Sequence, residues 1–165
     1  MKAADAPGMV KLFDTGGTLL ATYETGALPD NVAFSPDGRY LLTANEGEPS
    51  DDYSVDPEGS FTLIDIMNGA SNAKVTQISL QGETAQADSR IVKPGSNFAA
   101  DAEPGYVAFA PDGKKAYVAP QGNNAVAVID IATAKVVGIA GLGVNNVSRT
   151  SHDMSNKDRG ITMQR

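Results

Sequence analysis

The same pattern occurs twice in this chain, and it restricts the possible folds more than any other feature. The segment Pro29 to Ile66 begins PDNVAFSPDGRYLLTANEG and ends FTLIDI, and the segment Pro104 to Ile131 begins PGYVAFAPDGKKAYVAP and ends AVAVIDI. In each copy an alternating run meets a Ser/Ala-Pro-Asp-Gly sequence, and two further β-favouring runs follow. The proline presets φ at the first turn position, the aspartate can accept a hydrogen bond from the backbone two residues on, and the glycine tolerates positive φ. The repeat therefore predicts short antiparallel strands joined by tight turns.

Each copy continues into a fourth β-favouring run, so one unit is predicted to contain four strands. The stretch Val10 to Gly26 holds two such runs around Thr15-Gly16-Gly17-Thr18, and it looks like the last two strands of a unit. The chain then divides into a partial unit at 1–27, a full unit at 28–80 with an acidic insert at 48–57, a long loop at 81–102, a second full unit at 103–143 and an irregular tail at 144–165.

The predicted fold class is all-β, with the four-stranded antiparallel meanders that form the blades of a β-propeller. A propeller typically closes with about four to eight blades, so two and a half blades do not form a ring. An open array would also leave apolar strand edges exposed. We expect completion by the remaining blades of a longer chain or by other chains, including copies of this one, and not a closed monomeric propeller.

Charge, cysteine content and hydropathy argue against several classes of partner and site. Lys and Arg number 13 against 20 Asp and Glu, and the net charge of −7 argues against nucleic acid or anionic membrane surfaces as main partners. With no cysteine, the chain has neither disulfides nor a thiolate metal site. No segment approaches the length of a membrane span, and the N-terminal MKAADAPGMV lacks the apolar run of a secretory signal, so membrane insertion is not expected.

Three segments resemble bacterial choice-of-anchor I proteins with YVTN-type propeller repeats. They are LPDNVAFSPDGRYLLTANEGEPSDDYSVDPEGS, the Asp101-Ala102-Glu103-Pro104 sequence, and the segment from His152 to Ile161, which is similar to a D-x-S-D-x-D-x-G-I pattern. Two positions depart from the family pattern, because Asn156 and Gly105 stand where acidic residues are usual. The resemblance implies that this chain is the first part of a longer propeller and that the protein is extracellular, periplasmic or attached to the cell surface. Some members are described as alkaline phosphatase-like, but the resemblance supplies no catalytic residues.

The insert of the first copy is the first candidate metal site. Carboxylates at this density suit Ca²⁺ or Mg²⁺, although the EF-hand pattern is absent. A solvated acidic loop held by two prolines would show the same composition, but neighbouring carboxylates repel one another without a cation. The candidate ligands here are Glu46, Glu48, Asp51, Asp52, Asp56 and Glu58.

Two further groups of oxygen ligands lie outside the insert. Asp101 and Glu103 precede the innermost strand of the second unit, so in a propeller they would meet Glu46 near one end of the channel; ordinary turn chemistry before a proline is the alternative. Asp153 and Asp158 lie in an oxygen-rich turn that could take Ca²⁺ or serve only as a polar turn. The single histidine, His152, has no G-x-S-x-G sequence to accompany it and is not expected to act as a general base.

Matched apolar positions predict the core. The aspartates Asp65 and Asp130, each between two isoleucines, are expected to bond turn backbone rather than to act in catalysis. The predicted core residues are Val32, Phe34, Leu42, Ile64, Ile66, Val107, Phe109, Val118, Ile129 and Ile131.

Two functions are compatible with these features. The first is a non-catalytic propeller module that binds a ligand or partner through its loops and is stabilised by calcium. The alternative is part of a metal-dependent phosphoesterase, in which Glu46, Glu48, Asp101 and Glu103 hold a metal that activates water. We rank the binding module first, because a fold by itself does not imply a chemistry.

Overall fold

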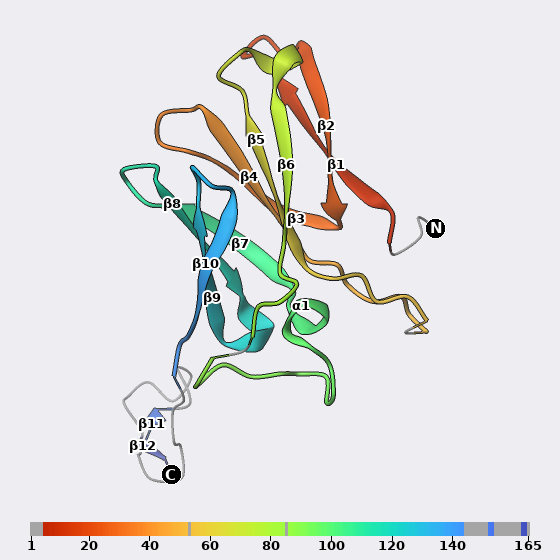
Figure 1. Cartoon of the computed structure of the whole chain (residues 1–165), viewed down its shortest axis with the longest axis vertical. Helices are drawn as coiled ribbons and strands as arrows, with labels where there is room; N and C mark the ends of the chain where they lie inside the picture. The colour runs from red at the N-terminus through yellow and green to blue at the C-terminus, as the bar shows by residue number, and fades with distance from the viewer. Residues whose placement is uncertain (1–4, 53, 85, 144–151, 154–162, 165) are drawn as a thin grey trace.

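Between residues 7 and 141 the chain forms three antiparallel sheets that follow one another along the sequence (Figure 1). The computed structural model describes residues 5–52, 54–84, 86–143, 152–153 and 163–164. A two-stranded hairpin comes first, with β1 at Pro7–Phe13 and β2 at Leu19–Ala27. The second sheet has the order β3 (Pro29–Phe34), β4 (Tyr40–Asn45), β5 (Ser60–Asp65) and β6 (Lys74–Ser79). The third has the order β7 (Pro104–Phe109), β8 (Lys115–Pro120), β9 (Ala125–Asp130) and β10 (Lys135–Gly141). The predicted all-β fold of four-stranded meanders is confirmed.

The described residues also form several short secondary-structure elements. Two 3₁₀ turns, Ala70–Asn72 and Gln121–Asn123, lie after β5 and β8, and one helical turn, α1, spans Phe98–Asp101. Within 144–165, expected to be irregular, the two-residue strands β11 (His152–Asp153) and β12 (Met163–Gln164) pair antiparallel. Among the described residues no helix is long and apolar enough to cross a bilayer.

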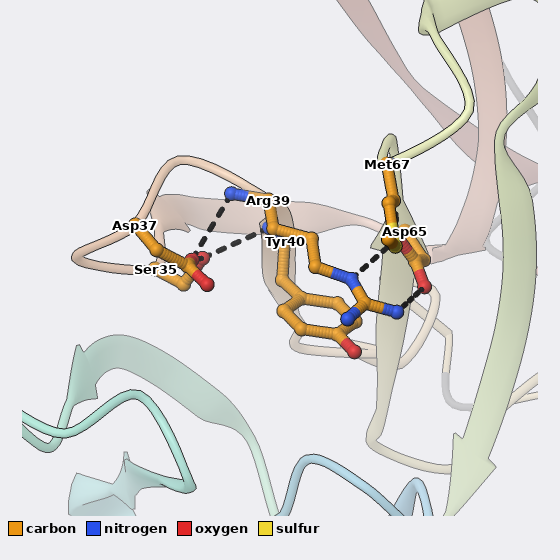
Figure 2. Close-up of polar contacts among 6 residues, drawn as sticks. All are labelled: Ser35, Asp37, Arg39, Tyr40, Asp65 and Met67. Atoms are coloured by element: carbon orange, nitrogen blue, oxygen red, sulfur yellow. Dashed lines mark hydrogen bonds and ion pairs between the residues drawn. The ribbon is translucent and has the colours of Figure 1, made fainter.

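The Pro-Asp-Gly turns form as their chemistry requires, and Figure 2 shows the turn of the first copy. In the first copy, Asp37 Oδ1 accepts hydrogen bonds from the Arg39 N–H at 3.1 Å and from the Ser35 hydroxyl at 2.6 Å, and Gly38 takes a φ of 71°. In the second copy, Asp112 Oδ1 accepts from the Lys114 N–H at 3.0 Å. Both hairpins are therefore closed by the same side-chain contact.

An aspartate at the end of the third strand of each unit bonds the turn that follows. Asp65 Oδ1 accepts from the Met67 N–H at 3.0 Å, and its carboxylate also pairs with the Arg39 guanidinium, which lowers the pKa of Asp65 (Figure 2). Asp130 Oδ1 accepts from the Thr133 N–H at 2.9 Å. Asp14 does the same at the end of β1, accepting from Gly16 N–H at 2.9 Å. The hairpin thus has the local chemistry of the last two strands of a unit.

The β3–β6 sheet is covered on both faces. One face packs against the third sheet in the main core, which includes Leu42, Phe61 and Val118, all 0% exposed. The other face contributes Leu41 and Ile64 to a smaller cluster that packs against the β1–β2 hairpin. The core thus lies between consecutive sheets, as packing between blades requires.

The core prediction is wrong for Val32 and Phe34, which are 48% and 53% exposed. Their matched residues in the second copy, Val107 and Phe109, belong to the main core or pack against it. The difference arises because β7 packs against β3 and β4, whereas the described residues before β3 form a sheet of β1 and β2 alone. Ile66 is only half-buried and lies at the edge of the smaller cluster.

The long loop after β6 is not wholly irregular, which corrects the sequence prediction. At α1 the Asn97 side chain accepts a hydrogen bond from Ala100 N–H at 3.0 Å, as an N-cap does, and Phe98 and Ala99 are buried in the main core. A helix of four residues is too short to show a 3.6-residue apolar period, so periodicity does not reveal it.

Candidate functional site

The loop carrying the acidic insert meets the loop that leads into β7. The backbone N–H of Gly59 donates to the Ala99 carbonyl at 3.0 Å, and a Cβ at Gly59 would lie 2.1 Å from the Ala102 carbonyl oxygen. The end of the insert therefore lies directly against the segment that holds Asp101 and Glu103.

A group of carboxylates from the two full units gathers here, and we call it the acidic end: Asp30, Glu46, Glu48 and Glu103. Burial raises the pKa of Glu46, and the charges of Asp30, Glu48 and Glu103 raise it further. Burial likewise raises the pKa of Glu103, together with the charges of Glu48, Asp101 and Asp56. The charge of Glu103 therefore acts on Glu46, and the convergence of these carboxylates on a metal stays a prediction. Sequence reasoning missed Asp30, whose signal was its place at the start of an innermost strand.

Glu103 borders two cavities. One has a volume of about 370 Å³ and is lined by Glu48, Pro49, Ser50, Asp51 and Glu103. The other has a volume of about 380 Å³, and its lining adds two cations to the carboxylates: Pro49, Asp56, Arg90, Val92, Lys93, Ala100, Asp101, Glu103 and Gly122. The acidic end therefore opens onto enough space for an ion or a small cationic group.

Asp101 lines the second cavity, but its side chain is buried and bound by protein donors. Its carboxylate accepts hydrogen bonds from Val92 N–H at 2.8 Å, Lys93 N–H at 2.6 Å and Asn123 Nδ2 at 2.5 Å. The Asn123 side chain also donates to the Arg90 carbonyl at 3.1 Å, while its Oδ1 is buried without a hydrogen-bond partner. These contacts tie the long loop to the second unit, and the sequence contained no signal for Asn123 or Arg90.

The remaining carboxylates of the insert have separate surroundings. Asp52 Oδ1 accepts hydrogen bonds from the Ser54 hydroxyl, the Ser50 hydroxyl and the Ser54 N–H, which together lower the pKa of Asp52 to about 2. Asp56 forms an ion pair with Lys93. Asp51 is exposed and Glu58 is half-buried. The insert is thus a loop with its own hydrogen bonds rather than a ring of free carboxylates.

The ten predicted metal ligands do not form one group. No three His, Cys, Asp or Glu side chains lie together as metal ligands within the part of the chain that the structure describes. Asp158 falls outside the described residues, and for His152 and Asp153 only the backbone strand is described. Calcium binding therefore stays a prediction, and it now concerns the acidic end.

The raised pKa of Glu103 predicts a pH-dependent effect of Glu103→Gln. Below about pH 4.5 the side chain is protonated in both folded and unfolded chains, so the variant and the wild type should have equal stability. As pH rises through the raised pKa, the folded wild type carries a charge it disfavours and loses stability, and the variant does not. Urea unfolding at pH 7 should therefore show Glu103→Gln with the higher midpoint. Glu24→Gln, at an exposed carboxyl on β2, is the control, and an equal gain for both variants would contradict the prediction.

One family model matches this chain, and two solved structures share its fold. The family model of the choice-of-anchor I domain matches residues 1–165. No curated protein matches the chain. Among solved structures, hydrazine synthase from Kuenenia stuttgartiensis aligns with 79% of this chain at 15% identity and a TM-score of 0.52. A putative 6-phosphogluconolactonase from Bacteroides fragilis aligns with 82% of it at 14% identity and a TM-score of 0.50. The aligned part is 41% and 34% of those two chains, and at these identities the likeness concerns the fold alone.

Proposed function

The chain belongs to the choice-of-anchor I domain family, and we propose that it contributes blades to a β-propeller that binds a cationic ligand or partner at the bacterial cell surface. Family membership indicates a surface-associated protein with a β-propeller-type domain. We place the binding site for the cationic ligand or partner at the acidic end.

One observation carries this proposal: Glu46 and Glu103 come from consecutive units, and burial, together with repulsion from Glu48, raises the pKa of each. Like charges held together destabilise the folded chain unless a cation neutralises them. Because this repulsion lowers the stability of the folded chain, a bound cationic group would explain why these carboxylates lie here.

Calcium is the first cation to test, because carboxylate oxygens are its preferred ligands. Asp52, Asp56 and Asp101 already have protein partners. The remaining candidate ligands are therefore Glu46, Glu48 and Glu103, with Asp30 beside them. A calcium ion would have to draw these side chains closer together, since no three of the described carboxylates are grouped as metal ligands.

If calcium binds the folded state alone, it should raise the free energy of unfolding by about 2.7 kcal/mol at one hundred times its dissociation constant. Calorimetric titration and thermal melting with calcium or chelator measure this. Glu103→Gln should weaken the effect and Glu24→Gln should leave it intact. Equal melting in calcium and chelator, with no heat of binding, would show that the calcium assignment is wrong.

The far face of the third sheet supports the proposal that further blades complete the propeller. Tyr106, Tyr117 and Val137 on this sheet are 65%, 43% and 55% exposed. The residue matched to Tyr117 in the first unit is Leu42, which the third sheet buries completely. A face that one unit buries and the next exposes is what a row of sheets shows at its end. Among the described residues, no arrangement of metal ligands favours the phosphoesterase alternative.

A further inference from the structure

The larger of the two cavities that Glu103 borders carries charges of both signs. Its lining includes Arg90, on the long loop, and Glu103, directly before β7. Two other charged side chains of the lining, Asp56 and Lys93, form an ion pair with each other. The carboxylate of Asp101 accepts three hydrogen bonds from the protein. Among the described residues, Arg90 and Glu103 are therefore the charges of this cavity that have neither an ion pair nor such a set of donors.

Arg90 is held at the cavity by three hydrogen bonds to one short turn. Its Nε donates to the Gly122 carbonyl at 2.6 Å, its backbone N–H donates to the Asn123 carbonyl at 2.9 Å, and its own carbonyl accepts from Asn123 Nδ2 at 3.1 Å. Neither terminal nitrogen of the guanidinium bonds a described residue. Two adjacent N–H groups of this kind bind a carboxylate with two parallel hydrogen bonds. Arg90 is thus positioned to receive an anion.

The residue that holds Arg90 contains a destabilising feature. Asn123 is 0% exposed, and its Nδ2 serves both Arg90 and Asp101, whereas its Oδ1 has no hydrogen-bond partner among the described residues. A buried acceptor without a partner destabilises a folded chain. A binding role for the Arg90 guanidinium would explain why the fold accepts this loss.

Glu103 supplies the opposite charge. Burial raises the pKa of Glu103, and the charges that raise it further belong to Glu48, Asp101 and Asp56, which are all acidic. No ion pair joins Arg90 to Glu103, although both line the same cavity. A metal ion beside Glu103 would leave Arg90 without a partner. A ligand that carries a positive and a negative group could pair with both side chains at once.

We propose that this cavity binds a small zwitterion of the amino-acid type, with its carboxylate on the terminal nitrogens of Arg90 and its ammonium group on the carboxylate of Glu103. The inference rests on the proposed function and specifies it, since the cationic group at the acidic end then belongs to a ligand that also carries an anion. The cavity volume of about 380 Å³ lies near the lower end of ligand-binding pockets, which start at about 300 Å³. Pro49, Val92 and Ala100 in the lining offer apolar contacts to the methylene groups of such a ligand.

The test compares zwitterions with singly charged molecules of the same chain length. Isothermal titration calorimetry in calcium-free buffer measures glycine, β-alanine and γ-aminobutyrate, and then the alkylamine and the carboxylate that each lack one of the two charged groups. We expect the best of the three zwitterions to bind about tenfold more tightly, or better, than either singly charged counterpart, because each counterpart loses one charge-assisted contact. This comparison uses the unaltered protein, so it does not depend on the folding of a variant.

Substitutions then separate the two contacts. Arg90→Gln should reduce the affinity for the zwitterion to that of the alkylamine, and Glu103→Gln should reduce it to that of the carboxylate. Arg90→Lys keeps the charge without the paired donors, so it should give an intermediate affinity. Lys114→Gln is the matched control, because it removes one positive charge from an exposed residue in the β7–β8 turn and should leave every affinity unchanged.

The outcomes distinguish this inference from the proposed function. Equal affinities for the zwitterion and the alkylamine would overturn the inference and leave a cation site at the acidic end. Equal effects of Arg90→Gln and Lys114→Gln would also overturn it. If no zwitterion binds, the inference is wrong, and the calcium titration decides separately whether the acidic end takes a cation.

Discussion

Replacing Gly59 with alanine is expected to lower the free energy of unfolding by about 3 kcal/mol, because the added methyl group has no space. Its Cβ would lie 2.1 Å from the Ala102 carbonyl oxygen and 2.7 Å from Cδ of Pro104. The first of these is a backbone atom, so relief requires the start of β5 to move away from the segment leading into β7. Urea unfolding followed by circular dichroism measures the loss.

Gly138→Ala is the matched control for this prediction. Gly138 also lies in a strand, but a Cβ there would meet no atom within 4 Å. Its stability should change by no more than about 0.5 kcal/mol. If the two variants unfold at the same urea concentration, the insert and the segment before β7 do not approach as closely as described.

Asp101→Ala is expected to cost about 4 kcal/mol, since it removes one acceptor that serves three donors. The N–H groups of Val92 and Lys93 and the amide of Asn123 would each lose this partner. Amide exchange at Val92 and Lys93 should accelerate together with the loss of stability, which distinguishes a lost acceptor from a general loosening.

Asp51→Ala is the control within the same region, because Asp51 is an exposed carboxylate of the insert. It should change the free energy of unfolding by no more than about 0.5 kcal/mol. A small effect of Asp101→Ala, similar to that of Asp51→Ala, would show that Asp101 does not anchor the long loop.

The fold was predictable because its signals are local. The Pro-Asp-Gly turns, the alternating strands and the aspartates at the ends of β1, β5 and β9 depend on contacts within a few residues of the chain, and they form as the sequence indicates. The repeat also led us to expect Glu46 and Glu103 at the same end of neighbouring strands, and the charge of Glu103 acts on Glu46. The four-residue helix α1 was not predictable, because it spans little more than one turn, which is too short for an apolar helical pattern to repeat.

Tertiary contacts decide which carboxylates are free to bind a cation. Asp101 and Glu103 are two residues apart in the sequence and both carry a carboxylate. Three protein donors, from Val92, Lys93 and Asn123, bind Asp101, whereas Glu103 borders two cavities and has no such donors among the described residues. Whether a carboxylate can bind a cation depends on which donors the fold brings to it, and sequence spacing does not contain that information.

The sequence by itself determined the strands, their turns and the order of the sheets, since these depend on residues close together in the chain. Only the tertiary structure decided which of two matched residues is buried. Val32 and Val107 occupy the same place in the repeat, but Val107 faces two strands of the preceding unit and Val32 faces a unit that contributes only β1 and β2. Burial depends on the neighbour that a surface meets, so identical sequence positions differ at the end of a row of sheets.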